Sequence, residues 1–378
     1  MRVAHVSDAY LPRLGGIETQ VHGLALHQRA EGIEAEVLTA TPRSRHDRTT
    51  HELLDGVPVH RVTVDLPYEL PVHPHPGREV LRVVEEGRFD AVHLHLGVIA
   101  PFAQGAARTL VRAGVPLVAT VHSLWGPAVG LFRAADRMWG WGGWPIVFTA
   151  VSDVAAEPIR AVLRGRAEVA VLPNGIAPAF WLPPAVPAPR DPGEVLVVSA
   201  MRLAPRKRPL PLVEILRAAR ERVPAAVGMR AVVAGEGPQR AAVERRLRRH
   251  GLDWVELPGR LGPAALRDLY RRADLYVSPG VLEAFGIAAL EARTAGLPVL
   301  ARAGTGVAEF VRDGEEGVLA PSDAALTGAL ARLTADGEAR AAMAAACRAQ
   351  PPSASWSRVV ECSREFYARA VALSAARR

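Results

Sequence analysis

The chain has 378 residues, of which 49% are hydrophobic and 22% charged, a composition that excludes a disordered protein and leaves room for two domains. The net charge of +7 does not indicate nucleic-acid binding, because the arginines are scattered and the densest run, Glu244–His250, is typical of one solvated helix face. We therefore expect no nucleic-acid partner. The excess charge better suits an anionic membrane surface or a phosphorylated acceptor.

Cysteine usage and hydropathy indicate a cytoplasmic location. Cys347 and Cys362 are the two cysteines, and their spacing does not resemble a metal site. The first residues, MRVAHVSDAY, show no basic and then hydrophobic leader. Residues 114–132 lack Asp, Glu, Lys and Arg, but Pro116 and Pro127 interrupt them, which favours a strand and a loop over a membrane span.

A strand is expected at Val3–Ser7, and the next segment, YLPRLGGIET, leads into a helix that ends near Glu31. Gly15 and Gly16 lie between the two elements. Adjacent glycines there allow the backbone to approach a phosphate with its N–H groups exposed. A tight turn is the alternative, because the full spacing of a dinucleotide-binding loop is missing.

Further strands alternate with segments of helix length in the first half of the chain. The strands are expected at Glu36–Leu38, Pro58–Val62, Ala91–Leu96, Leu117–Val121, Ile146–Val151 and Val169–Leu172, and helices include Gly77–Glu86 and Pro101–Ala113. This alternation predicts a parallel sheet with helices on both faces, in which ligands gather beyond the carboxyl ends of the strands.

Histidines and tryptophans in this half are candidate functional residues. His122 directly follows a predicted strand, where it can contact a sugar hydroxyl or hold the backbone. His93 and His95 share one face of a strand, but a third metal ligand is not evident, so we expect no metal site. The tryptophans at 125, 139, 141 and 144 suit an acceptor rim, a membrane contact or packing beside the site.

The proline-rich stretch Ala177–Glu194 is typical of a stiff linker, and a second alternation of strands and helices follows it. The expected elements are strands Val195–Ser199, Arg230–Ala234, Trp254–Leu257, Leu275–Ser278 and Pro298–Ala301, and helices Pro209–Arg222, Pro238–His250 and Pro263–Arg272. The second half is therefore also predicted to be a doubly wound α/β domain.

Two acids mark the stretch 278–300, SPGVLEAFGIAALEARTAGLPVL. Glu283 precedes and Glu291 lies within an apolar segment, 286–292, which predicts a buried helix. A carboxylate in such a helix needs hydrogen-bond donors, and a ribose diol supplies two. The N–H groups near Phe285 and Gly286 can face a phosphate. The alternative is that both acids are ordinary, partly solvated helix residues.

Two cations follow the first strand of the second half. Arg202 and Lys207 lie in MRLAPRKRP, and Lys207 is the only lysine among 46 basic residues. A lone lysine in such a chain suggests a position that needs a compact ammonium group. We interpret the two cations as a clamp for a diphosphate, with solvated loop charges as the alternative.

The ordered motifs resemble the retaining glycosyltransferases of the GT-B fold, family 4, over nearly the whole chain. The matching segments are Gly15–Gly16 followed by Glu18, His122 after its strand, LPNGI (Leu172–Ile176), RLAPRK (Arg202–Lys207), AGEGP (Ala234–Pro238), EAFGIAALEA (Glu283–Ala292) and GVAEFVRDGEEG (Gly306–Gly317).

The resemblance implies two Rossmann-like, doubly wound parallel-sheet domains that face a central cleft. The boundaries would be an acceptor domain at 1–178, a linker at 179–194, a donor domain at 195–350 and a helix at 351–378 that crosses back to the first domain.

It also implies roles for residues. Arg202 and Lys207 would hold the donor diphosphate, Glu291 the ribose and Glu283 the transferred sugar. The backbone at Gly15, Gly16, Phe285, Gly286 and Ile287 would bind phosphates and sugar, Arg260 the base, and His122 the sugar near the reacting carbon.

The implied reaction is transfer of a hexose from a nucleotide sugar to a hydroxyl, without a cofactor or an obligatory metal. Ala200 and Arg208 stand where the family often has glycine, which puts the local backbone in doubt. Two alternatives remain open. A sugar-nucleotide epimerase or a phosphorylase on the same scaffold would be revealed by donor turnover without acceptor, and a non-catalytic protein would bind nucleotide without turnover.

Overall fold

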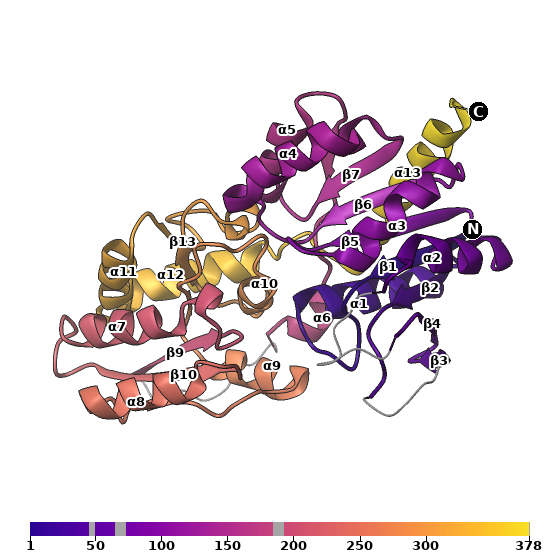
Figure 1. The fold of residues 1–378 in the computed structure, drawn as a ribbon. Coiled ribbons are helices and arrows are strands. Elements are labelled where there is room, and N and C mark those ends of the chain that lie inside the picture. The colour runs from indigo at the N-terminus through magenta and orange to yellow at the C-terminus, as the bar shows by residue number, and fades with distance from the viewer. Residues whose placement is uncertain (45–49, 65–72, 184–192, 378) are drawn as a thin grey trace. The chain divides into compact units, whose positions relative to one another are not determined.

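The computed structural model describes residues 1–44, 50–64, 73–183 and 193–377. The chain forms two compact units (Figure 1): Met1–Gly175 together with Ala354–Arg378, and Ile176–Ser353. Most of the predicted linker, residues 184–192, lies outside the described residues.

The first unit is built on an eight-stranded sheet in the order β3-β4-β2-β1-β5-β6-β7-β8. Its strands are β1 (Arg2–Ser7), β2 (Glu34–Thr39), β3 (His51–Leu54), β4 (Val57–Arg61), β5 (Ala91–Leu96), β6 (Leu117–Val121), β7 (Ile146–Ala150) and β8 (Val169–Val171). All neighbours are parallel except β3 and β4. β5, β6 and β7 are buried along their whole length, as central parallel strands are when helices cover both faces.

The helices of this unit are α1 (Gly16–Ala30), α2 (Pro76–Glu86), α3 (Pro101–Arg112), α4 (Val129–Trp139), α5 (Asp153–Leu163) and α13 (Trp356–Ala375), with 3₁₀ turns η2 (Gly126–Ala128) and η3 (Trp141–Gly143). Local sequence explains several starts. A proline opens α2 and α3, and the hydroxyl of Ser152 accepts from the N–H of Ala155 at the start of α5.

Several elements were not predicted, among them β3 and α4. β3 forms a hairpin with β4 through Asp55 and Gly56, both of which have positive φ, as a two-residue hairpin turn requires. The stretch expected to be strand and loop up to residue 132 instead enters α4 at Val129. The prolines that argued against a membrane span lie before this helix, so they do not interrupt it.

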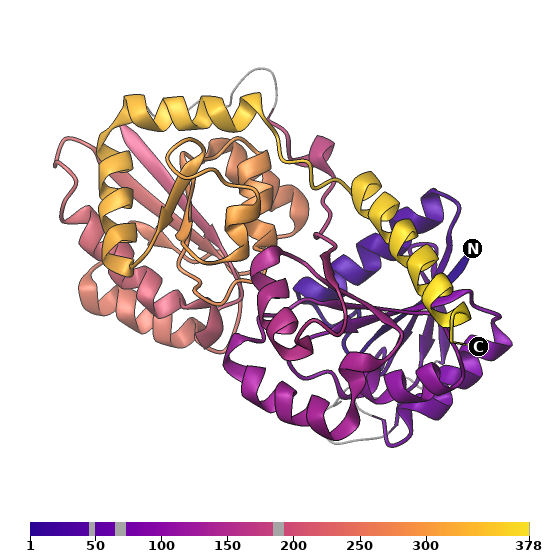
Figure 2. The ribbon, with the colours of Figure 1, turned by 90° about the horizontal axis from the view of Figure 1, so that it is seen from above.

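Helix α13 packs on the first unit, beside α1 and against β5, β6 and β7. Figure 2 shows it in yellow, running alongside the indigo α1. Its Val359, Val360, Phe366 and Tyr367 belong to a core that also contains residues of β1, β5, β6 and β7. The hydroxyl of Ser355 accepts from the N–H of Arg358 and so caps the helix.

The second unit holds a six-stranded parallel sheet in the order β11-β10-β9-β12-β13-β14. Its strands are β9 (Glu194–Ala200), β10 (Gly228–Ala234), β11 (Val255–Glu256), β12 (Leu275–Ser278), β13 (Val299–Arg302) and β14 (Gly317–Ala320). The helices are α6 (Pro178–Trp181), α7 (Pro209–Arg220), α8 (Arg240–His250), α9 (Pro263–Arg272), α10 (Ile287–Thr294), α11 (Asp323–Ala335) and α12 (Gly337–Ala349), with η4 (Pro205–Lys207) and η5 (Gly306–Glu309).

The predicted strand and helix alternation of both halves is confirmed, with boundaries that shift by one or two residues at most ends. The second core joins Val197 of β9 and Val277 of β12 to Leu212 and Leu216 of α7. Within the described ranges, no helix combines the length and apolarity needed to cross a bilayer.

Candidate active site

The strand order of the second sheet brings the predicted acids and cations together beyond the carboxyl ends of its strands. β9 lies between β10 and β12, so the strands that follow β9 in sequence are added first on one side of it and then on the other. Open α/β sheets bind ligands at such a switch point, beyond the carboxyl ends of the strands. Arg202 and Lys207 follow β9, and Glu283 follows β12.

The side chains of Lys207 and Glu283 meet beyond these strand ends. Nζ of Lys207 donates to Oε2 of Glu283 at 2.5 Å. The ammonium side chain is 36% exposed and the carboxylate 15%, so an incoming ligand can reach both. Arg202 is exposed, and none of the described side chains pairs with its guanidinium. The structure therefore joins one predicted cation directly to one predicted acid and leaves the other cation open to solvent.

Close backbone contacts fix the loop that carries these cations. Gly235 and Gly237 have φ of +143° and +157°, and a Cβ on them would lie 1.8 Å from the carbonyl oxygen of Met201 and 2.4 Å from that of Leu203. The N–H of Leu203 donates to the carbonyl of Glu236 at 2.8 Å. Only glycine permits this approach, which explains the AGEGP motif.

Arg260 lies on a neighbouring loop beyond the same strand ends. The N–H of Gly235 donates to the carbonyl of Gly259 at 2.7 Å, and Arg260 follows with an exposed side chain. Backbone hydrogen bonds thus connect the loops that carry Arg202 and Arg260.

Helix α10 begins beside Glu283. Gly286 is its N-cap with φ of +96°, and no side chain caps the helix, so the N–H groups of its first turn lack intrahelical acceptors. A Cβ at Gly286 would lie 2.9 Å from Cγ2 of Val307. Phe285 is buried, and Ile287 is the first helical residue and half-buried.

Glu291 occupies the second turn of α10, as predicted, and its carboxyl group is unusual. Burial raises its pKa to about 8. Two tyrosines lie near, but the hydroxyl of Tyr270 donates to the carbonyl of Ala288 and that of Tyr276 to the carbonyl of Ala200. Among the described residues, none donates a hydrogen bond to the Glu291 carboxylate. A ligand with two adjacent hydroxyl groups would supply the missing donors.

Arg208, which stands where glycine was expected, keeps the conformation that glycine would favour. Its φ is +59°, and it is the N-cap of α7. Its guanidinium donates to both carboxylate oxygens of Asp323, at 2.9 and 2.6 Å, and to the carbonyl of Pro279 at 2.9 Å. These three bonds offset the cost of a left-handed backbone, roughly 1–2 kcal/mol.

In the first unit, the predicted site residues Gly15 and Gly16 lie at the start of α1, and His122 follows β6. Gly15 is the N-cap of α1, and Gly16 its first residue. The carboxylate of Glu18 lies so close that a Cβ at Gly15 would be 2.4 Å from Oε2. An acid of the chain itself therefore lies at the helix N-terminus, where a phosphate was expected.

His122 follows β6, as expected, and its Nε2 lies 3.0 Å from Nδ1 of His95. Burial of the ring lowers the pKa of His122 to about 4, so the ring is neutral at pH 7. It also lines a small cavity of about 20 Å³ together with Thr120, Asn174 and Trp356.

The tryptophan-rich segment is mainly packing. Trp125 is buried, stacks on Phe132 at 3.8 Å and donates from Nε1 to the carbonyl of Gly97 at 3.1 Å. Trp141 packs edge-on against Trp125. Trp139, in contrast, is 58% exposed on α4.

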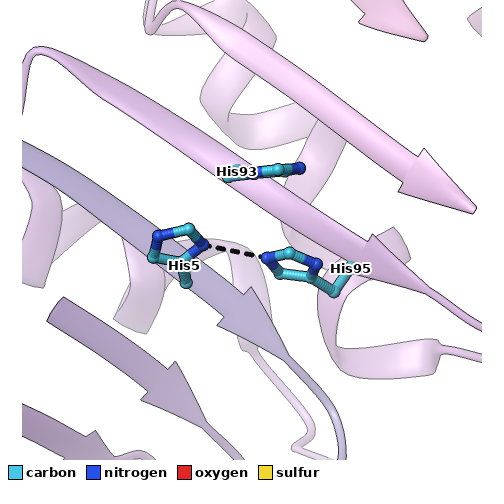
Figure 3. Close-up of side chains that lie close together, drawn as sticks. All are labelled: His5, His93 and His95. Atoms are coloured by element: carbon cyan, nitrogen blue, oxygen red, sulfur yellow. Dashed lines mark hydrogen bonds between the residues drawn. The ribbon is translucent and has the colours of Figure 1, made fainter. Parts of the chain in front are cut away.

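His5 and Asp323 were not among the residues predicted from the sequence. His5 lies in β1 beside His93 and His95 of β5, and the three buried rings form one cluster (Figure 3). Asp323 begins α11, and the Ser322-Asp323 pair is a recognisable helix start that could have singled it out.

The comparisons with known proteins agree with this architecture. Residues 14–180 match the model for Glycosyltransferase Family 4, and residues 187–350 match that for Glycosyl transferases group 1. The chain is 30% identical to a glycogen synthase of Mycobacterium tuberculosis, over 90% of this chain and 87% of that protein. It is also 30% identical to a D-inositol 3-phosphate glycosyltransferase of Acidothermus cellulolyticus, over 88% of this chain and 82% of that protein.

Among solved structures, Anabaena HepE in complex with UDP and glucose superposes with a TM-score of 0.73 at 17% identity, over 97% of this chain and 99% of that chain. The two parallel-sheet units thus have the GT-B fold of glycosyltransferases. The chain itself belongs to glycosyltransferase family 4, whose second half is the group 1 domain.

Proposed function

We propose that the protein is a retaining glycosyltransferase that moves a hexose from GDP-mannose or a UDP-hexose to an acceptor hydroxyl. The acceptor would belong to a glycolipid, a polysaccharide or a small-molecule glycoside precursor. One observation carries the proposal: Lys207 and Glu283 meet at the switch point of the second sheet, next to the helix that holds Glu291.

The chemistry follows from the charges. When the bond from the anomeric carbon to the diphosphate oxygen breaks, negative charge grows on the leaving group and positive charge on the sugar. Arg202 and Lys207 would stabilise the diphosphate in place of a metal ion, and Glu283 would orient sugar hydroxyls. The acceptor oxygen would bond to the anomeric carbon from the face that the diphosphate leaves, and its proton would pass to the departing phosphate oxygen.

Before the donor binds, Lys207 and Glu283 neutralise each other. A bound diphosphate would draw the ammonium toward it, which frees the carboxylate to accept from the sugar. Glu291 would accept from the two ribose hydroxyls, and the N–H groups at the start of α10, which no side chain caps, would face a phosphate. Arg260 would contact the base, and His122 a sugar hydroxyl.

Thermal shift with a panel of GDP- and UDP-sugars tests the donor, because a ligand that binds the folded state raises the melting temperature. We expect one donor and its nucleoside diphosphate to stabilise the wild type, and Glu291→Gln to reduce both shifts. Transfer assays with that donor then test catalysis. Sugar interconversion without acceptor would indicate an epimerase, and binding without turnover would indicate a non-catalytic protein.

We also propose that α4 makes peripheral contact with an anionic membrane surface. Leu131, Met138 and Trp139 are 71%, 74% and 58% exposed, and the exposed Arg133 and Arg137 lie on the same short helix. Co-sedimentation should be stronger with phosphatidylglycerol vesicles than with phosphatidylcholine vesicles, and Leu131→Ser with Trp139→Ser should weaken it. Equal binding to both vesicles would contradict the electrostatic part of the proposal.

A further inference from the structure

A buried network of hydrogen bonds lies behind His122 in the first unit. His5 of β1 pairs in register with His93 of β5, and His95 follows two residues later on the same face (Figure 3). The rings of His93 and His95 stack at 4.2 Å between centroids. All three side chains are essentially inaccessible to solvent, so their polar atoms depend on protein partners.

The three histidines are close enough to hold a metal ion, but their nitrogens are already engaged. The candidate ligand atoms lie within 4.8 Å of one another. Both nitrogens of His5 have partners, at 2.9 Å on His95 and 2.7 Å on Gln28. Both nitrogens of His93 have partners as well, on Tyr367 and Thr120.

His95 is likewise bonded through both nitrogens, to His5 and His122. A metal would have to break several buried hydrogen bonds, so this cluster is better explained as a hydrogen-bond network.

The orientation of the Gln28 side-chain amide, on α1, determines which atoms of the network donate and which accept. The hydroxyl of Ser363 donates its only hydrogen to the carbonyl of Val360 at 2.7 Å. It must therefore accept from Gln28, which identifies the neighbouring Gln28 atom as the amide nitrogen, 3.0 Å away. The same nitrogen donates to the hydroxyl of Tyr367 at 2.8 Å. The carbonyl oxygen of Gln28 then faces Nε2 of His5.

That orientation fixes the tautomer of every ring along the chain. Because Oε1 of Gln28 can only accept, Nε2 of His5 carries the proton and Nδ1 of His5 accepts from Nε2 of His95. Nδ1 of His95 must then accept from Nε2 of His122. Burial lowers the pKa of His5 to about 4 and that of His95 well below its usual value, so each ring holds a single proton at pH 7.

A second series of hydrogen bonds runs from Gln28 through Tyr367 to His93, and its donors and acceptors are consistent with the same orientation of the Gln28 amide. Tyr367 accepts from Gln28 and donates to Nδ1 of His93 at 2.9 Å. Nε2 of His93 donates to the hydroxyl of Thr120 at 2.6 Å, and Thr120 donates onward to Thr149. Both hydrogens of the Gln28 amide and every ring nitrogen of the cluster therefore have a matching partner.

We propose that Gln28, acting through His5 and His95, is a positioning residue that holds His122 with its proton on Nε2 and leaves Nδ1 as a hydrogen-bond acceptor. No described residue donates to Nδ1 of His122. An acceptor nitrogen without a protein partner suits a hydroxyl of the transferred sugar, and this last step rests on the proposed function. A site of this kind discriminates against a donor analogue that lacks the hydroxyl.

Nitrogen-15 NMR of the ligand-free, histidine-labelled protein tests the tautomer without any activity. His122→Asn assigns the His122 signals. At pH 7 we expect long-range proton–nitrogen correlations to show a protonated Nε2 and a bare Nδ1, unchanged down to pH 5.5. A proton on Nδ1, or averaged signals from two tautomers, would overturn the proposal whatever the protein catalyses.

Three variants test the role of Gln28. Gln28→Met removes the acceptor and should shift the Nδ1 signal of His122 toward the protonated position. Gln28→Glu still accepts from His5 and should keep the wild-type tautomer. Gln20→Met is the matched control, because Gln20 is a buried glutamine of the same helix whose amide, among the described residues, hydrogen-bonds the backbone of Gly175 and no ring of the histidine network. It should leave the His122 signals unchanged.

An unchanged His122 tautomer in folded Gln28→Met would refute the role of Gln28. If that variant does not fold, the pattern in Gln28→Glu decides, and loss of the wild-type tautomer there would refute it. Once a donor is known, Gln28→Met should raise its KM roughly 10-fold, the worth of about one hydrogen bond. Failure to find any transfer would count against the proposed function and leave the NMR result intact.

Discussion

Replacement of Lys207 by alanine is the most informative perturbation of the second unit. The wild-type ammonium lies 2.5 Å from the Glu283 carboxylate, on a 3₁₀ turn whose loop is fixed by backbone contacts, so it is held in position before the reaction. Removal of one preorganised donor to a developing negative charge costs about 2.7–4 kcal/mol, or 10²–10³ in kcat. Because the side chain is 36% exposed, solvent screens part of this effect. We therefore expect the lower end, a fall of about 10² in kcat.

The assay is release of nucleoside diphosphate at saturating donor and acceptor. Arg206→Ala is the matched control, because Arg206 is the neighbouring exposed cation on the same turn and should lose less than about 3-fold. Lys207→Arg should recover only part of the rate, since a planar guanidinium replaces a compact ammonium. A Lys207→Ala enzyme that retains the wild-type kcat, or that loses no more than Arg206→Ala, would refute the assigned role.

Substitutions at three further residues, Glu291, Arg293 and Arg208, test the buried acid, a buried ion pair and the left-handed backbone. Burial raises the pKa of Glu291 from 4.5 to about 8, so ionisation of this carboxyl group destabilises the folded state. The unfolding free energy of the wild type, relative to that of Glu291→Gln, should therefore fall between pH 4.5 and 8 in denaturant titrations. A constant difference would contradict the raised pKa. Nucleoside diphosphate affinity should rise from pH 7 to 9 in wild type and stay flat in Glu291→Gln, as calorimetry can measure. Arg293→Met breaks a buried pair with Glu316 at 2.5 Å and should cost about 3–5 kcal/mol in denaturant unfolding, whereas a loss under about 1 kcal/mol would show that the pair is not needed. Arg208→Gly should be more stable than Arg208→Ala by about 1 kcal/mol, because only glycine relieves the left-handed backbone, and the reverse order would contradict this account.

The candidate site residues of the second unit could be predicted because each of them lies in a short, local sequence pattern. A strand, a loop with cations and a helix with an acid each occupy a short stretch, and the rule that ligands gather beyond parallel strands brings Lys207 near Glu283. The family resemblance then added roles that spacing alone does not give. Glu291 was recognisable because a lone acid stood in an apolar helix.

Long-range pairing hid the remaining features from sequence analysis. His5 joins His95 across 90 residues, and Gln28 joins Tyr367 across 339, so neither contact has a local signature. Arg208 keeps the backbone of a glycine because Asp323, 115 residues later, holds its guanidinium. Helix α4 was missed because the prolines and glycines before it obscured its own periodicity.

The central claim is that the protein transfers the donor sugar with retention of its anomeric configuration, and that its own side chains stabilise the leaving diphosphate in place of a metal ion. Proton NMR of the anomeric signals during turnover tests it most directly, with the donor found by thermal shift, an acceptor and the chelator EDTA present. We predict that the new glycoside shows the same anomeric configuration as the donor and that its formation matches release of nucleoside diphosphate. Inversion of the anomeric carbon, interconversion of the donor without acceptor, or a rate abolished by EDTA would contradict the account.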